Sequence, residues 1–222
     1  MSYSIAIDGP AGAGKSTIAK TIAKKLGYIY VDTGAMYRAM ALYIIRKNIK
    51  PEETDKISLA CEDAKITIEY KDGEQIVILN GENVNPFIRA EEVGNMASVS
   101  SANKEVRLKL VELQRELARK SDVIMDGRDI GTYVLPNANV KIFLTASSAV
   151  RAKRRYDELI EKGQACNLAE IEQDIIERDR RDSTREFAPL KQAEDAVLVD
   201  SSNLTIEETI DTIIHLAKKD NI

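Results

Sequence analysis

The feature that most constrains this chain is a glycine-rich octapeptide near its beginning. Residues Gly9–Ser16 read Gly-Pro-Ala-Gly-Ala-Gly-Lys-Ser and match the pattern G-x-x-x-x-G-K-[ST]. A short apolar run, Ser4–Asp8, precedes the octapeptide, and apolar residues recur at helical spacing over Ser16–Leu26. Gly27 then stands where a helix C-cap belongs. Because the pattern requires a strand before it and a helix after it, the sequence predicts a phosphate-binding loop in an α/β fold.

Each residue type in this loop has a chemical reason. Glycines let backbone N–H groups converge on phosphate oxygens, and the positive end of the following helix faces the same point. We expect Lys15 to bridge the β- and γ-phosphates of Mg-ATP and Ser16 to offer its hydroxyl to the Mg²⁺. The residues expected to bind ATP are Gly9, Pro10, Ala11, Gly12, Ala13, Gly14, Lys15, Ser16 and Thr17. The loop leaves the acceptor open, because many proteins with such a loop hydrolyse nucleotide to drive motion or signalling.

Further short apolar runs alternate with helical patterns along the chain. The runs expected to form strands are Tyr28–Val31, Val123–Met125, Val140–Leu144 and Ala196–Val199. This alternation is typical of a parallel sheet with crossover helices. Between Lys65 and Val84 the pattern changes to alternation of apolar and polar residues, interrupted by Asp-Gly and Asn-Gly turns. We therefore expect one domain over residues 1–222, with a small antiparallel β insert at residues 62–86.

Composition and charge argue against several classes of function. Hydrophobic residues make up 44% of the chain and charged residues 31%, as in ordinary soluble globular proteins. The net charge of −4 gives no general attraction to nucleic acid or anionic lipid. Cys61 and Cys166 lie far apart and have no neighbouring His or Cys at metal-ligand spacing, so we expect reduced thiols. The sequence shows no secretory signal, and its longest apolar run, Ala39–Ile45, is far shorter than the roughly 20 residues of a membrane span. We therefore expect a cytoplasmic protein. We also expect a monomer.

Arginine-rich segments indicate where a second phosphate could bind. Transfer of a phosphoryl group between nucleotides must overcome repulsion between anions, and the guanidinium fork binds phosphate bidentately. The segment Asp126–Asp129 follows an apolar strand at the carboxyl edge of the sheet, where ligands bind in open α/β folds. Further candidates are Arg38, Arg178, Arg181 and Arg185. For the last three, and for the cluster Arg151, Arg154 and Arg155, a solvated salt-bridge ladder is the alternative interpretation.

The residues available as a general base favour one kind of acceptor. His215 is the only histidine and lies in the last predicted helix, where we expect a surface or packing role. A hydroxyl acceptor benefits from a base, whereas a monophosphate oxygen is already ionised near neutral pH. The sequence therefore favours a monophosphate acceptor. Because Asp32 or Asp129 could act as a base, a small-molecule alcohol such as shikimate stays an alternative, as does a nucleotide-binding switch without a small acceptor.

Taken together, these motifs resemble bacterial cytidylate kinases over nearly the whole chain. The segments that carry the resemblance are Ile7–Thr17, Asp32–Arg38, Asp126–Thr132, Lys141–Ala146 and Glu177–Arg185. The resemblance implies the P-loop nucleoside monophosphate kinase fold, with a five-stranded parallel sheet of adenylate-kinase-like order flanked by helices. It also implies that the β-rich insert lies in an acceptor-binding arm and that residues 151–165 form a lid. The implied reaction transfers the γ-phosphoryl group of ATP to CMP and dCMP in pyrimidine nucleotide metabolism, with uridylate or adenylate as alternative acceptors.

The same resemblance implies roles for individual residues. Ser98, Arg107 and Asp129 would read the cytosine base, because a carboxylate accepts from its amino group while its carbonyl and ring nitrogen need donors. Arg178 and Asp182 would contact the ribose. The other residues implied on the acceptor side are Thr33, Tyr37, Arg38, Asp126, Arg128 and Arg185, with Arg38, Arg128 and Arg185 on the phosphate. The implied catalytic residues are Lys15, Arg128, Arg185 and Arg154, the last reaching the transferred group from the lid.

Overall fold

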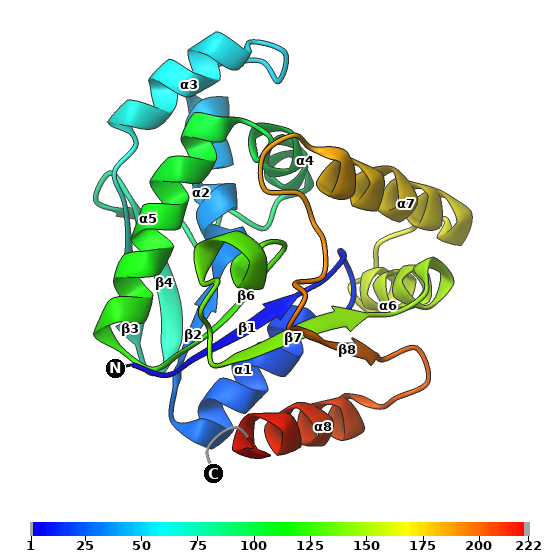
Figure 1. Ribbon diagram of the computed structural model, residues 1–222. Coiled ribbons are helices and arrows are strands. Elements are labelled where there is room, and N and C mark those ends of the chain that lie inside the picture. Colours follow the sequence, from blue (N-terminus) through cyan, green and yellow to red (C-terminus); the bar gives the residue numbers. More distant parts are fainter. Residues whose placement is uncertain (1, 220–222) are drawn as a thin grey trace.

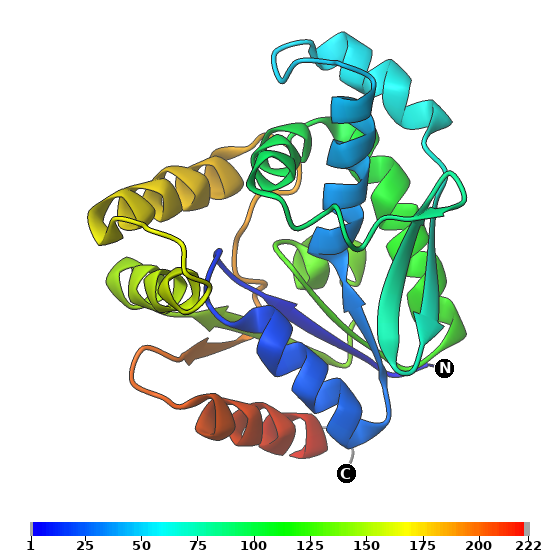
Figure 2. The same cartoon turned by 180° about the vertical axis from the view of Figure 1, so that it is seen from behind.

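Five parallel strands form the central sheet of the computed structural model, which describes residues 2–219 (Figures 1 and 2). In chain order the strands are β1 (Ser4–Asp8), β2 (Ile29–Asp32), β6 (Val123–Gly127), β7 (Val140–Thr145) and β8 (Val197–Asp200). In space they lie in the order β2-β6-β1-β7-β8, and every neighbouring pair is parallel. The predicted α/β fold with a five-stranded parallel sheet is confirmed.

The strand bounds show what an apolar run can and cannot predict. Strand β1 has the predicted bounds, whereas β6 and β7 continue past the predicted ends to Gly127 and Thr145. These end residues are polar or small, but the ladder continues through them, and Asp126 and Gly127 pair with Ile7 and Asp8. The residues that extend the strands are those that reach the carboxyl edge of the sheet.

Helices cover both faces of the sheet. They are α1 (Lys15–Leu26), α2 (Thr33–Arg46), α3 (Thr54–Asp63), α4 (Glu91–Ser100), α5 (Lys104–Lys120), the π-helix η1 (Ile130–Val134), α6 (Ser148–Glu161), α7 (Leu168–Thr184) and α8 (Ile206–Lys219). Successive residues of β1 point to opposite faces, so Ile5 and Ile7 pack with α1 and α8 while Ala6 packs with α2 and α5. Burial of both faces explains why the central strands are continuous apolar runs.

A three-stranded antiparallel sheet interrupts the α/β pattern where the insert was predicted. It consists of β3 (Ile66–Lys71), β4 (Glu74–Leu79) and β5 (Glu82–Asn83). Asp72 and Gly73 join the first two strands with φ of 54° and 76°, and Asn80 and Gly81 join the next two with φ of 50° and 87°. Positive φ at both central residues is the geometry that Asp-Gly and Asn-Gly turns favour in hairpins.

The hairpin of β3 and β4 packs against the outer edge of β2. Gln75 bonds the backbone of Asp32 twice: its Oε1 accepts from Asp32 N at 2.9 Å, and its Nε2 donates to Asp32 O at 3.1 Å. Tyr70 donates its hydroxyl to the Tyr30 carbonyl at 3.2 Å. These bonds satisfy backbone groups at an edge that would otherwise be unpaired. The hairpin thus holds the end of β2 that leads into the candidate site.

Helices α6 and α7 lie side by side at the opposite side of the molecule from the hairpin (Figures 1 and 2). Helix α6 contains residues 151–161 of the segment 151–165 that was predicted to be a lid, and that role stays a prediction. Cys61 is a buried free thiol and Cys166 a partly buried one. Among residues 2–219, no helix combines the length and the apolar character needed to cross a membrane.

Two glycine substitutions test how tightly the loop after β1 fits the sheet. Gly9 has φ of +149°, and a Cβ atom there would lie 1.9 Å from the Leu144 carbonyl oxygen. Gly27, at the C-cap of α1, also has positive φ but no atom within 4 Å of such a Cβ. We expect Gly9→Ala to lower the free energy of unfolding by about 3 kcal/mol or more and Gly27→Ala by only about 1 kcal/mol. Urea denaturation measures both, and equal losses would contradict the tight fit.

Candidate active site

Three segments of the chain meet at the carboxyl edge of the sheet: the loops after β1 and β6, and the start of α2 directly after β2. Strands β2, β6 and β1 are neighbours in space, with Asp8 beside Gly127 and Asp126 beside Asp32 in the strand register. The glycine-rich loop therefore lies next to the loop that carries Arg128. This arrangement is the one in which open α/β sheets bind ligands.

The glycine-rich loop has the conformation of an anion-binding cradle. Gly12 and Gly14 adopt positive φ of 75° and 85°, and Gly14 caps α1 without a side-chain hydrogen bond. The first amides of α1 therefore have no side-chain cap, as a helix end that binds phosphate requires. Lys15 is buried and donates its Nζ to the Pro10 carbonyl at 2.6 Å. Burial, and next the nearby charge of Arg128, lower the pKa of Lys15 to about 7, which means that the charged ammonium is destabilised here. An anion bound beside Lys15 would stabilise that ammonium.

Ser16 is exposed but bonds to the buried carboxylate of Asp126. Its hydroxyl donates to Asp126 Oδ2 at 2.9 Å, and the Tyr30 hydroxyl donates to Asp126 Oδ1 at 2.9 Å. Burial chiefly, and next the charge of Asp32, raise the pKa of Asp126 to about 6. Residues 2–219 contain no cluster of three His, Cys, Asp or Glu side chains able to hold a metal ion. A hydroxyl and one carboxylate fit Mg²⁺, which keeps several waters and takes its other oxygens from phosphates.

A network of buried arginines and carboxylates fills the site beside the loop. Arg107 is 1% exposed and donates to Asp129 Oδ2 at 2.6 Å, and its guanidinium lies 5.2 Å from the centre of the Tyr37 ring. Arg185 approaches the other oxygen of Asp129 at 3.5 Å and Asp182 Oδ1 at 3.9 Å. Two carboxylates from different parts of the chain thus hold arginines in place, which fixes donors that a bound ligand can use.

The network continues toward the glycine-rich loop with more positive charge. Arg128 donates from Nε to Asp182 Oδ2 at 2.7 Å. Burial, and next the charge of Arg128, lower the pKa of Arg178 to about 10, and burial also lowers the pKa of Arg38. Within residues 2–219, the buried atoms Arg178 Nε and Ser98 Oγ have no hydrogen-bond partner. Buried polar atoms normally have one, so these two mark positions that a ligand can satisfy.

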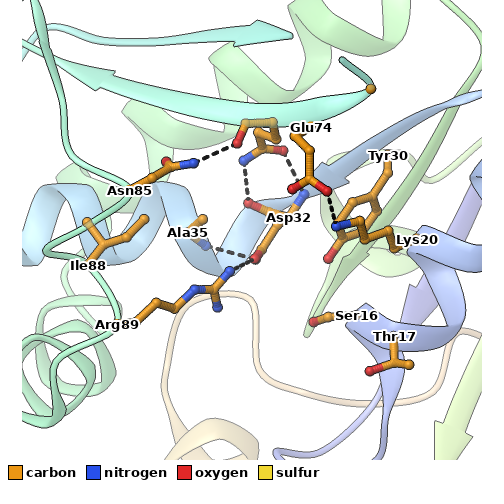
Figure 3. Close-up of a pocket in the computed structure, with 12 residues that line it drawn as sticks. Ser16, Thr17, Lys20, Tyr30, Asp32, Ala35, Glu74, Asn85, Ile88 and Arg89 are labelled. Carbon is orange, nitrogen blue, oxygen red and sulfur yellow. Dashed lines mark hydrogen bonds and ion pairs between the residues drawn. The ribbon is translucent and has the colours of Figure 1, made fainter. Parts of the chain in front are cut away.

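A cavity of about 380 Å³ opens beside this network, between α1, β2 and the hairpin (Figure 3). Figure 3 shows Asp32 at its centre, where one carboxylate oxygen accepts from Ala35 N at 2.9 Å and the other pairs with Arg89 at 2.7 Å. Lys20 and Glu74 pair across its rim at 2.6 Å. The lining residues are Ser16, Thr17, Lys20, Tyr30, Asp32, Ala35, Gly73, Glu74, Gln75, Asn85, Ile88 and Arg89.

Arg151 contacts the glycine-rich loop, a role that the sequence did not predict for any member of the cluster Arg151, Arg154 and Arg155. It donates to the Ala11 carbonyl at 2.9 Å and to the Ala146 carbonyl at 2.8 Å, and pairs with Asp179 at 2.7 Å. It is 5% exposed, although its sequence neighbourhood is typical of a solvated helix. The only sequence signal is its position in the first turn of the helix that follows β7. Arg154, one turn later, donates instead to the Ser201 carbonyl at 2.7 Å.

Comparisons with known proteins agree with this geometry. A sequence profile of the family described as "Cytidylate kinase" matches residues 5–219. The chain belongs to the cytidylate kinase family. A cytidylate kinase of Caldicellulosiruptor saccharolyticus is 54% identical over 97% of this chain and 95% of its own length. One from Lactobacillus gasseri is 55% identical over 97% and 94%. A gluconokinase structure from Sinorhizobium meliloti 1021 aligns over 98% of this chain and 94% of its own length, with a TM-score of 0.50 and 14% identity, and so shares the fold.

The structure brings most of the residues predicted for a cytidylate kinase into one place. The hydrogen bonds, ion pairs and ring contact described above join Tyr37, Arg107, Arg128, Asp129, Asp182 and Arg185. Thr33 donates to the Asp126 carbonyl at 2.6 Å, which joins the ends of β2 and β6. Arg181, by contrast, is exposed and bonds within α7, and His215 lies exposed on α8. The roles assigned to the site residues remain predictions.

We predict that Arg151 stabilises the fold through its contacts with the glycine-rich loop. Arg151→Met leaves the Ala11 and Ala146 carbonyls and Asp179 without this donor, so the free energy of unfolding should fall by about 2 kcal/mol or more. Arg155→Met is the matched control, because within the described residues 2–219 Arg155 pairs with Glu158 alone, at the surface, and it should cost less than about 0.5 kcal/mol. Urea denaturation of both variants gives the comparison, and equal stabilities would contradict the assignment.

Proposed function

We propose that this protein transfers the γ-phosphoryl group of ATP to CMP and dCMP, releasing ADP with CDP or dCDP. The observation that carries the proposal is the buried Arg107–Asp129 pair at 2.6 Å, in which Asp129 follows β6, the strand next to the one that leads into the glycine-rich loop. A loop alone fits any nucleotide-binding protein, but a paired carboxylate and guanidinium beside it fit a base with donors and acceptors on one edge. The relatives named cytidylate kinase support the same choice of acceptor.

On the donor side, the backbone of Gly9–Gly14 and the first turn of α1 hold the triphosphate. Lys15 gives up its bond to the Pro10 carbonyl and bridges the β- and γ-phosphates. Ser16 and Asp126 would hold Mg²⁺, which neutralises charge on the phosphate oxygens when bound. Tyr30 keeps the Asp126 carboxylate in place by its hydrogen bond.

On the acceptor side, arginines supply the charge that two repelling phosphates need. Arg38, Arg128 and Arg185 hold the acceptor phosphate, and Asp182 orients Arg128. Because carboxylates already hold Arg128 and Arg185 in place, little reorganisation accompanies the transfer. No general base is required, since the attacking phosphate oxygen is ionised near neutral pH.

The base and ribose are read by the same buried network. The Asp129 carboxylate accepts from the cytosine amino group, while Arg107 and Ser98 donate to the carbonyl and ring nitrogen. Ser98 Oγ, buried without a partner within residues 2–219, gains one in this way. Arg178 and Asp182 contact the ribose, and Tyr37 packs beneath Arg107. Uracil presents a carbonyl where cytosine has its amino group, so Asp129 would repel it.

The two peripheral elements complete the proposal. The hairpin belongs to the acceptor-binding arm, and residues 151–165 act as a lid that excludes water during transfer. Arg154 bonds to Ser201 in the present structure and would reach the transferred phosphoryl group on closure of the lid. The proposed setting is a cytoplasmic monomer acting in pyrimidine nucleotide metabolism.

The proposed function is tested by ADP release from ATP with a panel of acceptors. CMP and dCMP should support turnover with kcat/KM at least ~10-fold above UMP and AMP, since a paired polar edge discriminates by about 1–3 kcal/mol. Shikimate should give no turnover above the ATP-only background. If UMP, AMP or shikimate supports the fastest turnover, that compound replaces CMP as the proposed acceptor. If the protein binds ATP but none of these acceptors stimulates turnover, it is a nucleotide switch instead.

Arg128→Ala should lower kcat for CMP by at least ~10²-fold, the scale seen when a preorganised charged group is lost from a transition state. The matched control is Arg119→Ala, which should leave kcat unchanged, because in the part of the chain that the structure describes Arg119 pairs with Glu112 alone, at the surface of α5. Initial rates of ADP release at saturating substrates measure both. An Arg128→Ala enzyme within a factor of three of wild type would remove Arg128 from the mechanism.

Asp129→Asn should weaken the preference for cytosine, because the amide offers both a donor and an acceptor where the carboxylate only accepts. The ratio of kcat/KM for CMP to that for UMP should fall by at least ~10-fold, corresponding to about 1.4 kcal/mol. Circular dichroism should first confirm that the variant is folded, since Asp129 pairs with the buried Arg107. An unchanged ratio would mean that another residue selects the base.

A further inference from the structure

Asp8 is a buried carboxylate that no step of the proposed mechanism uses. It is the last residue of β1, directly before Gly9, and is 5% exposed. Its two oxygens accept from the backbone amides of Ile130 and Gly131 at 2.8 and 2.7 Å. Across residues 2–219 these amides are its hydrogen-bond partners, and no ion pair reaches it. One side chain thus links the start of the glycine-rich loop to the segment that follows Arg128 and Asp129.

The two amides that Asp8 binds are those that most need an acceptor. They begin the one-turn helix η1 (Ile130–Val134), and the first amides of any helix lack partners within it. Asp129 caps this helix without a side-chain hydrogen bond, because its carboxylate is engaged by Arg107 and Arg185. Asp8 therefore takes the place that a capping side chain would hold, and leaves Asp129 free for the buried network.

Asp8 contacts the chain on both sides of Arg128 and Asp129. At Gly131, a Cβ atom would lie in ordinary contact with Asp8 Oδ2 at 3.4 Å and closer to Lys141 Cδ at 3.2 Å. Asp8 lies beside Gly127 in the strand register, so its backbone and its side chain both contact the chain that flanks Arg128. The segment Arg128–Asp129 is thereby fixed at one end by the β1–β6 ladder and at the other by the Asp8 carboxylate.

A carboxylate is a costly choice for this position. Burial raises the pKa of Asp8 to about 6, with the nearby charge of Asp129 acting in the same direction, while the two amides and Lys15 act against it. An asparagine would have the same shape and no charge to desolvate, but it presents only one acceptor oxygen. The retained charge is consistent with a need for two acceptors held by one rigid group.

We infer that Asp8 is a positioning residue that sets the placement of Arg128 and Asp129 relative to the glycine-rich loop. This inference rests on the proposed function, in which Arg128 binds the acceptor phosphate and Asp129 reads the base. Asp8 touches neither nucleotide and acts through the backbone of Ile130 and Gly131. A displacement of about 1 Å in such a segment is enough to reduce a rate by up to ~10²-fold.

The test compares Asp8→Asn with Asp122→Asn. Asp122 also accepts a backbone amide, that of Tyr3, but at the amino edge of the sheet, so it is the matched control. Turnover of CMP by the wild type is established first. Asp8→Asn should then lower kcat by at least ~10-fold and reduce the preference for CMP over UMP. Its KM for ATP should stay within about twofold of the wild-type value. Asp122→Asn should match wild type in all three. Rates are measured well below the unfolding midpoint of each variant.

A second comparison separates positioning from general stabilisation. If Asp8 acts through Arg128, then Asp8→Asn introduced into Arg128→Ala should cost a much smaller factor than it costs in wild type, because residues that act as a unit are not additive. The same factor in both backgrounds, or a variant that loses only thermal stability with kcat and base preference intact, would overturn the inference. Absence of CMP turnover in the wild type would instead refute the proposed function.

Discussion

The backbone ladder between β1 and β6 is the interaction on which the site depends. Residues at the ends of these parallel strands pair in register, Asp8 beside Gly127, so the glycine-rich loop and the arginine-bearing loop leave the sheet together. Helices on both faces bury the strands and keep the ladder dry. The relative placement of the glycine-rich loop and the arginine-bearing loop is therefore a consequence of core packing, because the sheet fixes the distance between them.

The second constraint is electrostatic. Several arginines lie buried close together, and unpaired they would destabilise the fold. Asp129 and Asp182 offset this repulsion in the unliganded protein, each contacting two arginines, while burial and like charge still depress the pKa of Arg178. In the proposed function, anionic nucleotides relieve the remaining repulsion when they bind. The stability of the fold and the proposed affinity for phosphate would then depend on the same residues.

Those parts of the fold whose conformation depends on neighbouring residues in the chain were predictable from the sequence. The Gly9–Ser16 pattern, the apolar run of β1 and the Asp-Gly and Asn-Gly turns of the insert each specify their own conformation. Tertiary contacts were not predictable in this way. Nothing in the helical spacing of Arg151 and Arg154 distinguishes the one that binds the Ala11 carbonyl from the one that binds Ser201. The cavity around Asp32 and Arg89 arises only because the insert docks on β2, and Asp8 is recognisable as an acceptor only when η1 lies above it.

The most direct test of this account is a crystal structure of the protein with a non-hydrolysable ATP analogue and CMP. The account predicts the triphosphate on the backbone amides of Gly9–Gly14 and the CMP phosphate between Arg38, Arg128 and Arg185, with the cytosine ring against Asp129 and Arg107. A pyrimidine nucleotide bound away from these arginines, with Asp129 still facing only Arg107 and Arg185, would contradict it.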